Sequence, residues 1–184
     1  MAQPNLKQAA IKDVTFGENV TVIEPVNLYG CTIGNNSFIG PFVEVQRDAT
    51  IGERCRIQSH TFICELVTIG DDCFIGHGVM FTNDLFQSGG PSGPDRTKWK
   101  KTNIGRHVSI GSNATILPVN ICDRVVIGAG AMVTKDITRG FTLPANGQAG
   151  RNLDRILMRE GWRAAITAPT GRRKTGSKGC RPAP

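Results

Sequence analysis

The chain has 184 residues and a formal net charge of +7, from 22 Lys and Arg against 15 Asp and Glu. It contains no apolar run of about 18 residues, so we expect no membrane-spanning helix. Its N-terminal stretch MAQPNLKQAAIKDV lacks the apolar centre of an export signal. Six of the seven net positive charges lie after residue 162. The charge therefore belongs to a tail, and we expect a cytoplasmic protein whose body does not bind nucleic acid.

An apolar residue recurs every six positions through the first half of the chain. The series is Ile33, Ile39, Val45, Ile51, Ile57, Ile63, Ile69, Ile75 and Phe81, each preceded two positions earlier by a small or branched residue. An α-helix cannot keep this period on one face, because it turns about every 3.6 residues. Positions two apart share one side of a strand. Eighteen such strand-and-turn units up to Val133 predict about six triangular coils of an all-β, parallel β-helix.

The repeat stops at FTNDLFQSGGPSGPDRTKWKKTNIG, residues 81–105. A prism of short strands has flat faces, so ligand clefts come from loops or from junctions between subunits. Near its end, the insertion 82–101 places Trp99 among four cations. This combination suits an anionic ligand with a planar group, such as a nucleotide. A surface lid with solvated charges is the alternative.

The pattern divides the chain into three parts. Residues 1–137 are expected to form the β-helix domain, with the insertion as its active-site loop. Residues 138–162 are expected to form a C-terminal segment, in which a short α-helix over 151–162 caps the prism. Residues 163–184 are basic and rich in Gly, Pro and Thr, which is typical of a disordered tail. The six cysteines lack the spacing of a zinc site, and we expect reduced thiols that mostly fill the core.

Several segments resemble one family of enzymes. IGPFVEVQ, ICELVTIGDDCFIGHGVMFTNDLF, GGPSG, IGSNATILP and VVIGAGAMVTKDI are similar to the hexapeptide-repeat nucleotide-sugar N-acetyltransferases. GHGVMFTND before a GGP loop narrows the resemblance to enzymes that acetylate the 3-amino group of UDP-2-acetamido-3-amino-2,3-dideoxy-glucuronate. The resemblance implies left-handed coiling, a homotrimer with active sites between subunits, acetyl-CoA as cosubstrate, no metal, and a role in lipopolysaccharide O-antigen synthesis. The stretch RGFTLPANGQAGRNL departs from the family's usual ending, where CoA contacts are expected.

Acetyl transfer to an amine needs a neutral amine aimed at the thioester carbonyl and a stabilised oxyanion. His77 lies between two glycines, faces away from the core and precedes the insertion, so it is a candidate general base. The alternative is a turn histidine that only shapes the site, with a substrate-assisted reaction. Asn83 opens the insertion, and its amide is expected to orient the amine or polarise the carbonyl. A cap at the start of the loop is the alternative for Asn83.

Two further groups of residues are expected to bind the substrates. For the sugar nucleotide they are Asp84, Arg96, Lys98, Trp99, Lys101, Glu44 and Gln58, with Glu65 near the same face. For CoA they are Gly111, Ser112, Asn113, Gly128, Ala129, Lys135 and Arg151. Small turn residues let a pantetheine arm approach the backbone, and cations can meet phosphates. The cations of the insertion favour an acidic sugar.

Other functions fit the same repeats. An acetyltransferase for a dTDP-3-amino-hexose or a UDP-4-amino sugar shares all of this chemistry, because sugar identity depends on a few loop contacts. A γ-type carbonic anhydrase would bind zinc through three histidines. The spacing of His60, His77 and His107 does not give the close pair that such a site needs. A non-catalytic scaffold would leave the insertion without a role.

Overall fold

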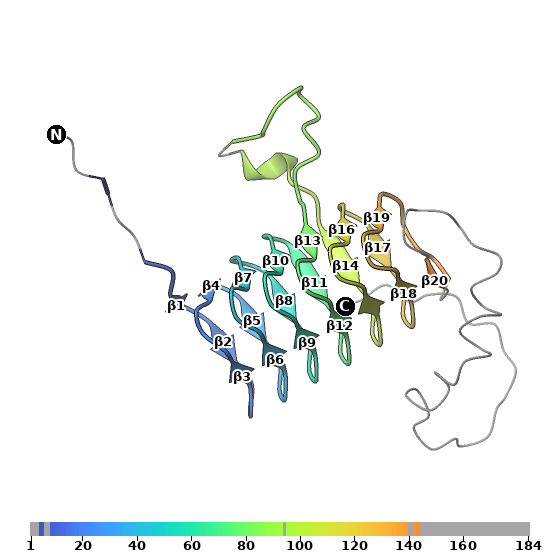
Figure 1. Ribbon diagram of the computed structural model, residues 1–184. Coiled ribbons are helices and arrows are strands. Elements are labelled where there is room, and N and C mark those ends of the chain that lie inside the picture. Colours follow the sequence, from blue (N-terminus) through green and yellow to red (C-terminus); the bar gives the residue numbers. More distant parts are fainter. Residues whose placement is uncertain (1–3, 6–7, 94, 140–141, 144–184) are drawn as a thin grey trace, which may run out of the picture.

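The computed structural model describes residues 4–5, 8–93, 95–139 and 142–143. These residues form a parallel β-helix in which each coil contributes one short strand to each of three sheets, which we name A, B and C (Figure 1). Among the described residues, no helix is long and apolar enough to cross a membrane. The predicted all-β solenoid is confirmed, and its left-handed coiling stays a prediction.

The strands of all three sheets are two or three residues long. Sheet A contains β1 (Ile11–Lys12), β4 (Asn27–Tyr29), β7 (Glu44–Val45), β10 (Phe62–Ile63), β13 (Met80–Phe81), β16 (Thr115–Ile116) and β19 (Met132–Val133). Sheet B contains β2 (Thr15–Phe16), β5 (Thr32–Ile33), β8 (Thr50–Ile51), β11 (Val67–Ile69), β14 (Thr102–Ile104) and β17 (Asn120–Ile121). Sheet C contains β3 (Thr21–Val22), β6 (Phe38–Ile39), β9 (Arg56–Ile57), β12 (Phe74–Ile75), β15 (Ser109–Ile110), β18 (Val126–Ile127) and β20 (Thr142–Leu143).

The six-residue period fills the inside of the prism. The nine apolar residues from Ile33 to Phe81 are at most 1% exposed. Parallel pairing keeps these residues in register, so that Ile39, Ile57, Ile75 and Ile110 form one column through sheet C. Each fully buried aliphatic side chain contributes roughly 1.5–3 kcal/mol relative to an exposed one. The repeat in the sequence is therefore the packing repeat of the core.

The stack is longer than the predicted six coils, since sheets A and C each contain seven strands. At one end β1 pairs with β4, although both of its residues are exposed and gave no apolar signal. At the other end Ile137 bridges to Ile121, and β20 pairs with β18. The predicted helix over 151–162 and the basic tail 163–184 lie outside the described residues.

Three columns of turns connect the sheets, and we name them by the sheets they join. The B–C corner follows sheet B, the C–A corner follows sheet C, and the A–B corner follows sheet A. The insertion 82–101 leaves the prism at the A–B corner, between β13 and β14, and contains the 3₁₀ turn η1 (Arg96–Lys98) (Figure 1). Cys31, Cys55, Cys64, Cys73 and Cys122 are free thiols and are all buried, as expected.

Candidate active site

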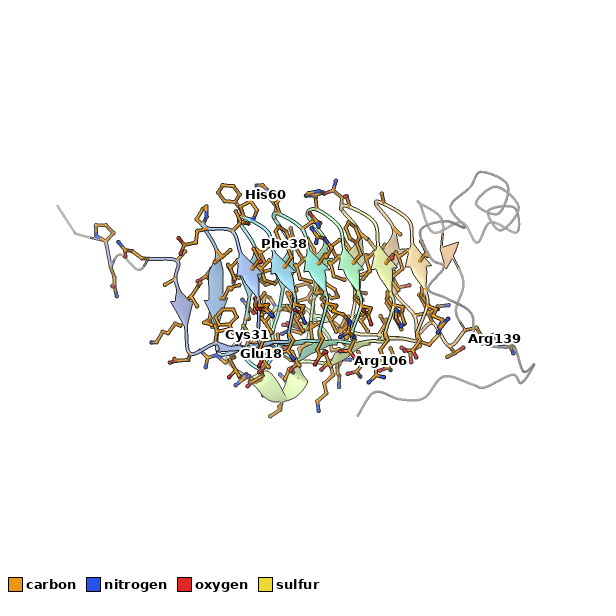
Figure 2. The ribbon with its side chains drawn as sticks, turned by 90° about the horizontal axis from the view of Figure 1, so that it is seen from below. Glu18, Cys31, Phe38, His60, Arg106 and Arg139 are labelled. Carbon is orange, nitrogen blue, oxygen red and sulfur yellow. The ribbon has the colours of Figure 1, made fainter. Side chains whose placement is uncertain are left out.

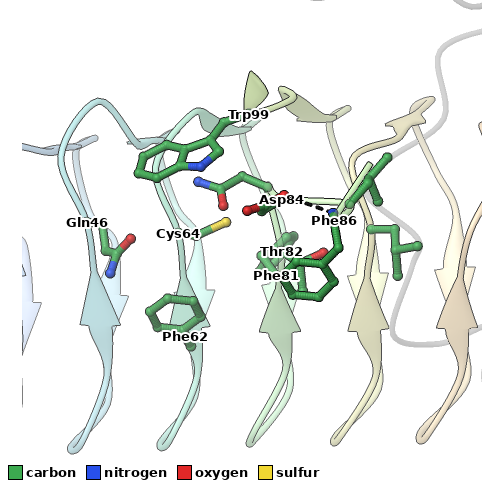
Figure 3. Close-up of a pocket in the computed structure, with 11 residues that line it drawn as sticks. Gln46, Phe62, Cys64, Phe81, Thr82, Asp84, Phe86 and Trp99 are labelled. Atoms are coloured by element: carbon green, nitrogen blue, oxygen red, sulfur yellow. Dashed lines mark hydrogen bonds between the residues drawn. The ribbon is translucent and has the colours of Figure 1, made fainter. Parts of the chain in front are cut away.

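A pocket of about 630 Å³ lies between the insertion and the outer face of sheet A (Figure 3). It is lined by Gln46, Phe62, Cys64, Phe81, Thr82, Asn83, Asp84, Leu85, Phe86, Trp99 and Leu117. Most of these side chains are apolar, and Asp84 is the one charged residue among them. The predicted link between the insertion and a ligand cleft therefore has a matching cavity in the described part of the chain.

Asn83 is held in one orientation by the neighbouring coil. Its Nδ2 donates to the backbone carbonyl of Glu65 at 3.2 Å, and its own carbonyl accepts from Lys100 N–H at 2.8 Å. Because a carbonyl can only accept, the Glu65 contact fixes which end of the amide is nitrogen. The Oδ1 atom of this pocket-lining side chain is then the end available to an incoming amine N–H.

Asp84 organises the insertion from within. Its carboxylate accepts from Ser92 N–H at 2.6 Å, from Phe86 N–H at 2.9 Å and from Ser92 Oγ at 3.1 Å. These hydrogen bonds, led by the one from Ser92 N–H, hold the pKa of Asp84 below its ordinary value. The predicted substrate-binding carboxylate thus has an internal role, because it closes the Gly- and Pro-rich part of the loop on itself.

The cations of the insertion lie mainly outside the pocket. Arg96 Nη2 contacts Asp48 Oδ2 at 2.6 Å and pairs with the Glu65 carboxylate. Lys98 Nζ lies 3.6 Å from Asp95, and Lys101 is exposed. Of the predicted sugar-nucleotide residues in this stretch, Trp99 lines the pocket, with Arg96 over its ring at 5.7 Å.

Glu44 and Gln58, also predicted to bind the sugar nucleotide, are separated from each other. Glu44 lies in β7 of sheet A, where its carboxylate accepts from Gln46 Nε2 at 2.9 Å, and Gln46 lines the pocket. Gln58 lies at the C–A corner, directly after β9. Glu44 therefore acts on the pocket through Gln46, whereas Gln58 lies away from it.

His77 lies at the C–A corner, one strand before Asn83 and the A–B corner. It is exposed, its Nδ1 is 2.9 Å from Ser59 Oγ, and it is not among the residues that line the pocket. The two predicted catalytic residues therefore occupy opposite ends of the same strand of sheet A within one chain.

Most of the predicted CoA residues share the corner of His77. Asn113 N–H donates to His77 carbonyl at 2.8 Å, and Gly130 N–H donates to Ser112 carbonyl at 2.8 Å, so these turns stack in one column. A Cβ at Gly111 would lie 2.4 Å from Ala129 N, which means that close stacking of the coils alone requires this glycine. Lys135 lies instead at the A–B corner, and Arg151 lies outside the described residues.

The three histidines do not meet. His60 stacks on Phe42 at the C–A corner, with ring centroids 4.8 Å apart, whereas His107 lies at the B–C corner, 3.9 Å from Asp72. Figure 2 shows His60 and Arg106, the neighbour of His107, on opposite sides of the prism. Among the described residues, no group of three or more His, Cys, Asp or Glu side chains could hold a metal ion.

Sequence reasoning missed several residues that build the pocket. Phe62 and Leu117 point outward from sheet A, and Leu85 and Phe86 begin the insertion. Apolar residues at outward-facing positions of the repeat were the available signal. Cys64 is only 2% exposed beneath the insertion, and this burial raises the pKa of its thiol to about 12.

Comparisons with protein families identify the repeats. The family described as "Bacterial transferase hexapeptide (six repeats)" matches residues 30–65. The family described as "Hexapeptide repeat of succinyl-transferase" matches residues 66–80 and 101–135. The unmatched residues between these last two ranges are those of the insertion.

Curated relatives share the repeats over a part of their length. The bifunctional protein GlmU of Synechococcus sp. (strain CC9605) is 30% identical over 169 residues, which cover 83% of this chain and 34% of GlmU. GlmU of Corynebacterium glutamicum (strain R) is 33% identical over 156 residues, covering 82% of this chain and 27% of that protein. The chain thus spans about a third or less of the length of these relatives.

Solved structures share the fold. AntD, an N-acyltransferase from Bacillus cereus in complex with dTDP and coenzyme A, superposes with a TM-score of 0.63 at 22% identity, covering 79% of this chain and 89% of AntD. PerB from Caulobacter crescentus, in complex with CoA and GDP-perosamine, gives a TM-score of 0.50 at 17% identity, covering 74% of this chain and 55% of PerB.

Proposed function

Since the chain is built from the hexapeptide repeats of the bacterial transferase family, we propose that it transfers the acetyl group of acetyl-CoA to the amino group of a nucleotide-linked sugar. The main support is the pocket that the insertion builds beside Asn83. AntD and PerB, which share the fold, bind coenzyme A together with a nucleotide or a nucleotide sugar. The same two classes of ligand suit the pocket and the C–A corner of this chain.

The separation of His77 and Asn83 supports a site that two subunits complete. In a homotrimer of parallel prisms, the C–A corner of one subunit would face the A–B corner of the next. His77 and the small turns at Ser112 and Ala129 would then supply the CoA side of the site. Asn83 and the insertion of the neighbouring subunit would supply the acceptor side.

The proposed reaction joins the sugar nitrogen to the acetyl carbonyl carbon and breaks the carbon–sulfur bond of acetyl-CoA. Asn83 Oδ1 would accept a hydrogen bond from the attacking amine, since its Nδ2 already donates to Glu65. The proton released by the nitrogen would pass to His77 Nε2 or to the departing thiolate. Ser59 engages the other ring nitrogen of His77 and so holds the imidazole in place.

The acceptor that we propose first is UDP-2-acetamido-3-amino-2,3-dideoxy-glucuronate. The exposed side chains of Lys100 and Lys101, next to the pocket-lining Trp99, are suited to its carboxylate or to its diphosphate. The apolar pocket, with Asp84 as its one charged lining residue, favours a second candidate. This candidate is an uncharged deoxyamino-hexose such as a dTDP-3-amino-hexose, because a carboxylate beside Asp84 would be repelled.

A direct assay distinguishes these acceptors. Acetyl-CoA is supplied with the UDP-linked uronate, with its 3-amino-glucose analogue or with a dTDP-3-amino-hexose, and acetylated product is measured by mass spectrometry. Faster turnover of the uronate supports the first candidate, and faster turnover of the deoxy sugar supports the second. The absence of acetylated product from all three acceptors, with folded protein, would contradict the proposed function.

A mixing experiment tests the shared site. His77→Ala and Asn83→Ala chains, each inactive alone, are combined by co-expression. If each site takes these two residues from different subunits of a closed ring, about a quarter of the sites contain both intact residues. Mixed protein should then recover about that share of wild-type turnover. No recovery in proven mixed oligomers would show that both residues act within one chain.

A further inference from the structure

We propose that Glu65 is a positioning residue that fastens the insertion to the A–B corner and thereby sets the acceptor pocket. As a role in acetyl transfer, this inference rests on the function proposed above. Glu65 lies in the turn between β10 and β11, one coil before the insertion. Neither the hexapeptide repeat nor the lining of the pocket identifies it.

The main chain of this turn holds both ends of the insertion. The Glu65 carbonyl accepts from Asn83 Nδ2 at 3.2 Å, where the insertion begins. The carbonyl of the next residue, Leu66, accepts from Thr102 N–H at 3.2 Å, where the insertion rejoins the prism. A shift of this turn would therefore move the pocket-lining amide and the point at which the loop returns.

The side chain of Glu65 holds the middle of the insertion. It is 8% exposed, and its carboxylate is flanked by Arg47 Nε at 3.5 Å and by the Arg96 guanidinium. Arg96 also contacts Asp48 at 2.6 Å, but that carboxylate is largely exposed, so water and salt weaken the pair. A buried carboxylate is costly unless it is paired, which makes Glu65 the stronger hold on Arg96.

Arg96 transmits this hold to the pocket. Its guanidinium lies over the ring of Trp99 at 5.7 Å, and Trp99 lines the cavity beside Asn83 and Asp84. The series of contacts runs from Glu65 to Arg96 to Trp99. We therefore expect loss of the Glu65 charge to free Arg96 and displace Trp99, while the prism beneath stays folded.

The experiment compares Glu65→Gln with Asp72→Asn. Asp72 pairs with Arg54 at 2.7 Å on the B–C corner, so this matched control also removes one partner of a one-carboxylate ion pair between coils. Both variants are made in a Trp162→Phe background, where Trp99 is the one remaining tryptophan. The readouts are Trp99 emission, the rate of tryptic cleavage after Arg96 and Lys98, and the KM for each substrate.

In Glu65→Gln we expect Trp99 emission to shift to the red and cleavage to speed up. The KM for the sugar nucleotide should rise about tenfold, with little change in the KM for acetyl-CoA. Asp72→Asn should leave all four readouts at the background value. If Glu65→Gln does not fold, Arg96→Gln removes the same pair from the side of the loop and should give the same changes.

Unchanged emission and cleavage in both Glu65→Gln and Arg96→Gln would overturn the proposal. These two readouts do not depend on turnover. If the background protein acetylates none of the sugars, the proposed function fails by itself, and emission and cleavage still decide whether Glu65 fastens the loop.

Discussion

The B–C and A–B corners are built from similar charged and amide side chains, but they connect different parts of the chain. At the B–C corner, Asn35 donates to Glu53 at 3.2 Å, Asp71 accepts from Glu53 N–H at 3.0 Å, and Arg54 pairs with Asp72 at 2.7 Å. Each of these partners is 18 residues from the other, which is one coil. The contacts form a ladder that repeats as the prism does.

At the A–B corner the contacts leave the repeat. Arg96 reaches Asp48 across 48 residues and pairs with the buried Glu65, and no equivalent appears on the other described coils. A ladder contact stabilises the stack wherever it occurs, whereas a contact made once holds one particular loop. The difference teaches that the unrepeated corner contacts, rather than the number of charges, mark the functional part of this solenoid.

The largest expected effect comes from removing the difference between the corners. A short Gly-Ser linker in place of residues 85–98 would leave the core untouched, because those residues that the structure describes there are not buried. We expect near-native circular dichroism and melting temperature, but acetyl transfer reduced by at least about 1,000-fold, since the acceptor would lose its wall. Retained turnover in the shortened protein would show that the insertion is not part of the site.

Replacement of Asn83 tests one atom of that wall. Asn83→Ala removes the Oδ1 that would orient the amine, and we expect kcat/KM to fall about 100-fold with a small change in melting temperature. The control is Asn103→Ala on sheet B, where the amide also bridges two coils, donating to Asn120 Oδ1 at 2.8 Å. Equal losses of activity in the two variants would mean that Asn83 acts only through the structure.

The ladder should respond in the opposite sense. Asp71→Ala removes the acceptor of Glu53 N–H and the partner of Arg106, 3.4 Å away. We expect the free energy of unfolding to fall by about 1 kcal/mol, measured by urea denaturation, with acetyl transfer unchanged. A loss of turnover without a loss of stability would place the B–C corner in the site and remove the distinction drawn above.

Much of this arrangement could be predicted from the sequence. The apolar period fixed the core, and the interruption located the pocket wall, because both depend on residues adjacent in the chain. The separation of His77 and Asn83 was also available, since the first follows a strand of sheet C and the second follows the next strand, in sheet A. The hexad count therefore determines the corner of every turn residue.

The pairing of Arg96 could not be predicted in this way. Its charge suited a ligand phosphate or carboxylate as well as Glu65, and the choice depends on how the loop folds back over earlier coils. Asp84 is similar, because its acceptors face loop amides that only the folded insertion brings near. Contacts that occur once have no period from which to infer them.

Acid should affect the two corners differently. Hydrogen bonds from Ser92 and Phe86 lower the pKa of Asp84, and Arg54 lowers that of Asp72. A depressed pKa contributes stability above the unfolded-state value, near about 4, and that stability is lost as pH falls through the folded value. We expect Trp99 emission in the Trp162→Phe background to be constant from neutral pH to about pH 4 and to shift below it.

The acid shift of Trp99 has two possible sources in the insertion. Asp95, whose pKa is lowered by hydrogen bonds from Thr97, is the second loop carboxylate in this range. Asp84→Asn should remove most of the shift and raise the acceptor KM by a small factor, whereas Asp72→Asn should leave the shift intact. A shift that survives in Asp84→Asn and disappears in Asp95→Asn would assign the loop's acid sensitivity to η1.

The smallest expected effect is on thiol labelling, and it reports the two corners in one experiment. Cys64 lies beneath the insertion and Cys73 beneath the B–C corner, and both are 2% exposed. Burial raises the pKa of Cys64 to about 12, and the hydrogen bond to Cys55, together with burial, raises that of Cys73. A thiolate-selective alkylating reagent near pH 8 should therefore modify both slowly, because little of either thiol is ionised. Mass spectrometry of Glu65→Gln should show faster modification of Cys64 with Cys73 unchanged, because only the cover over Cys64 is fastened by contacts that occur once.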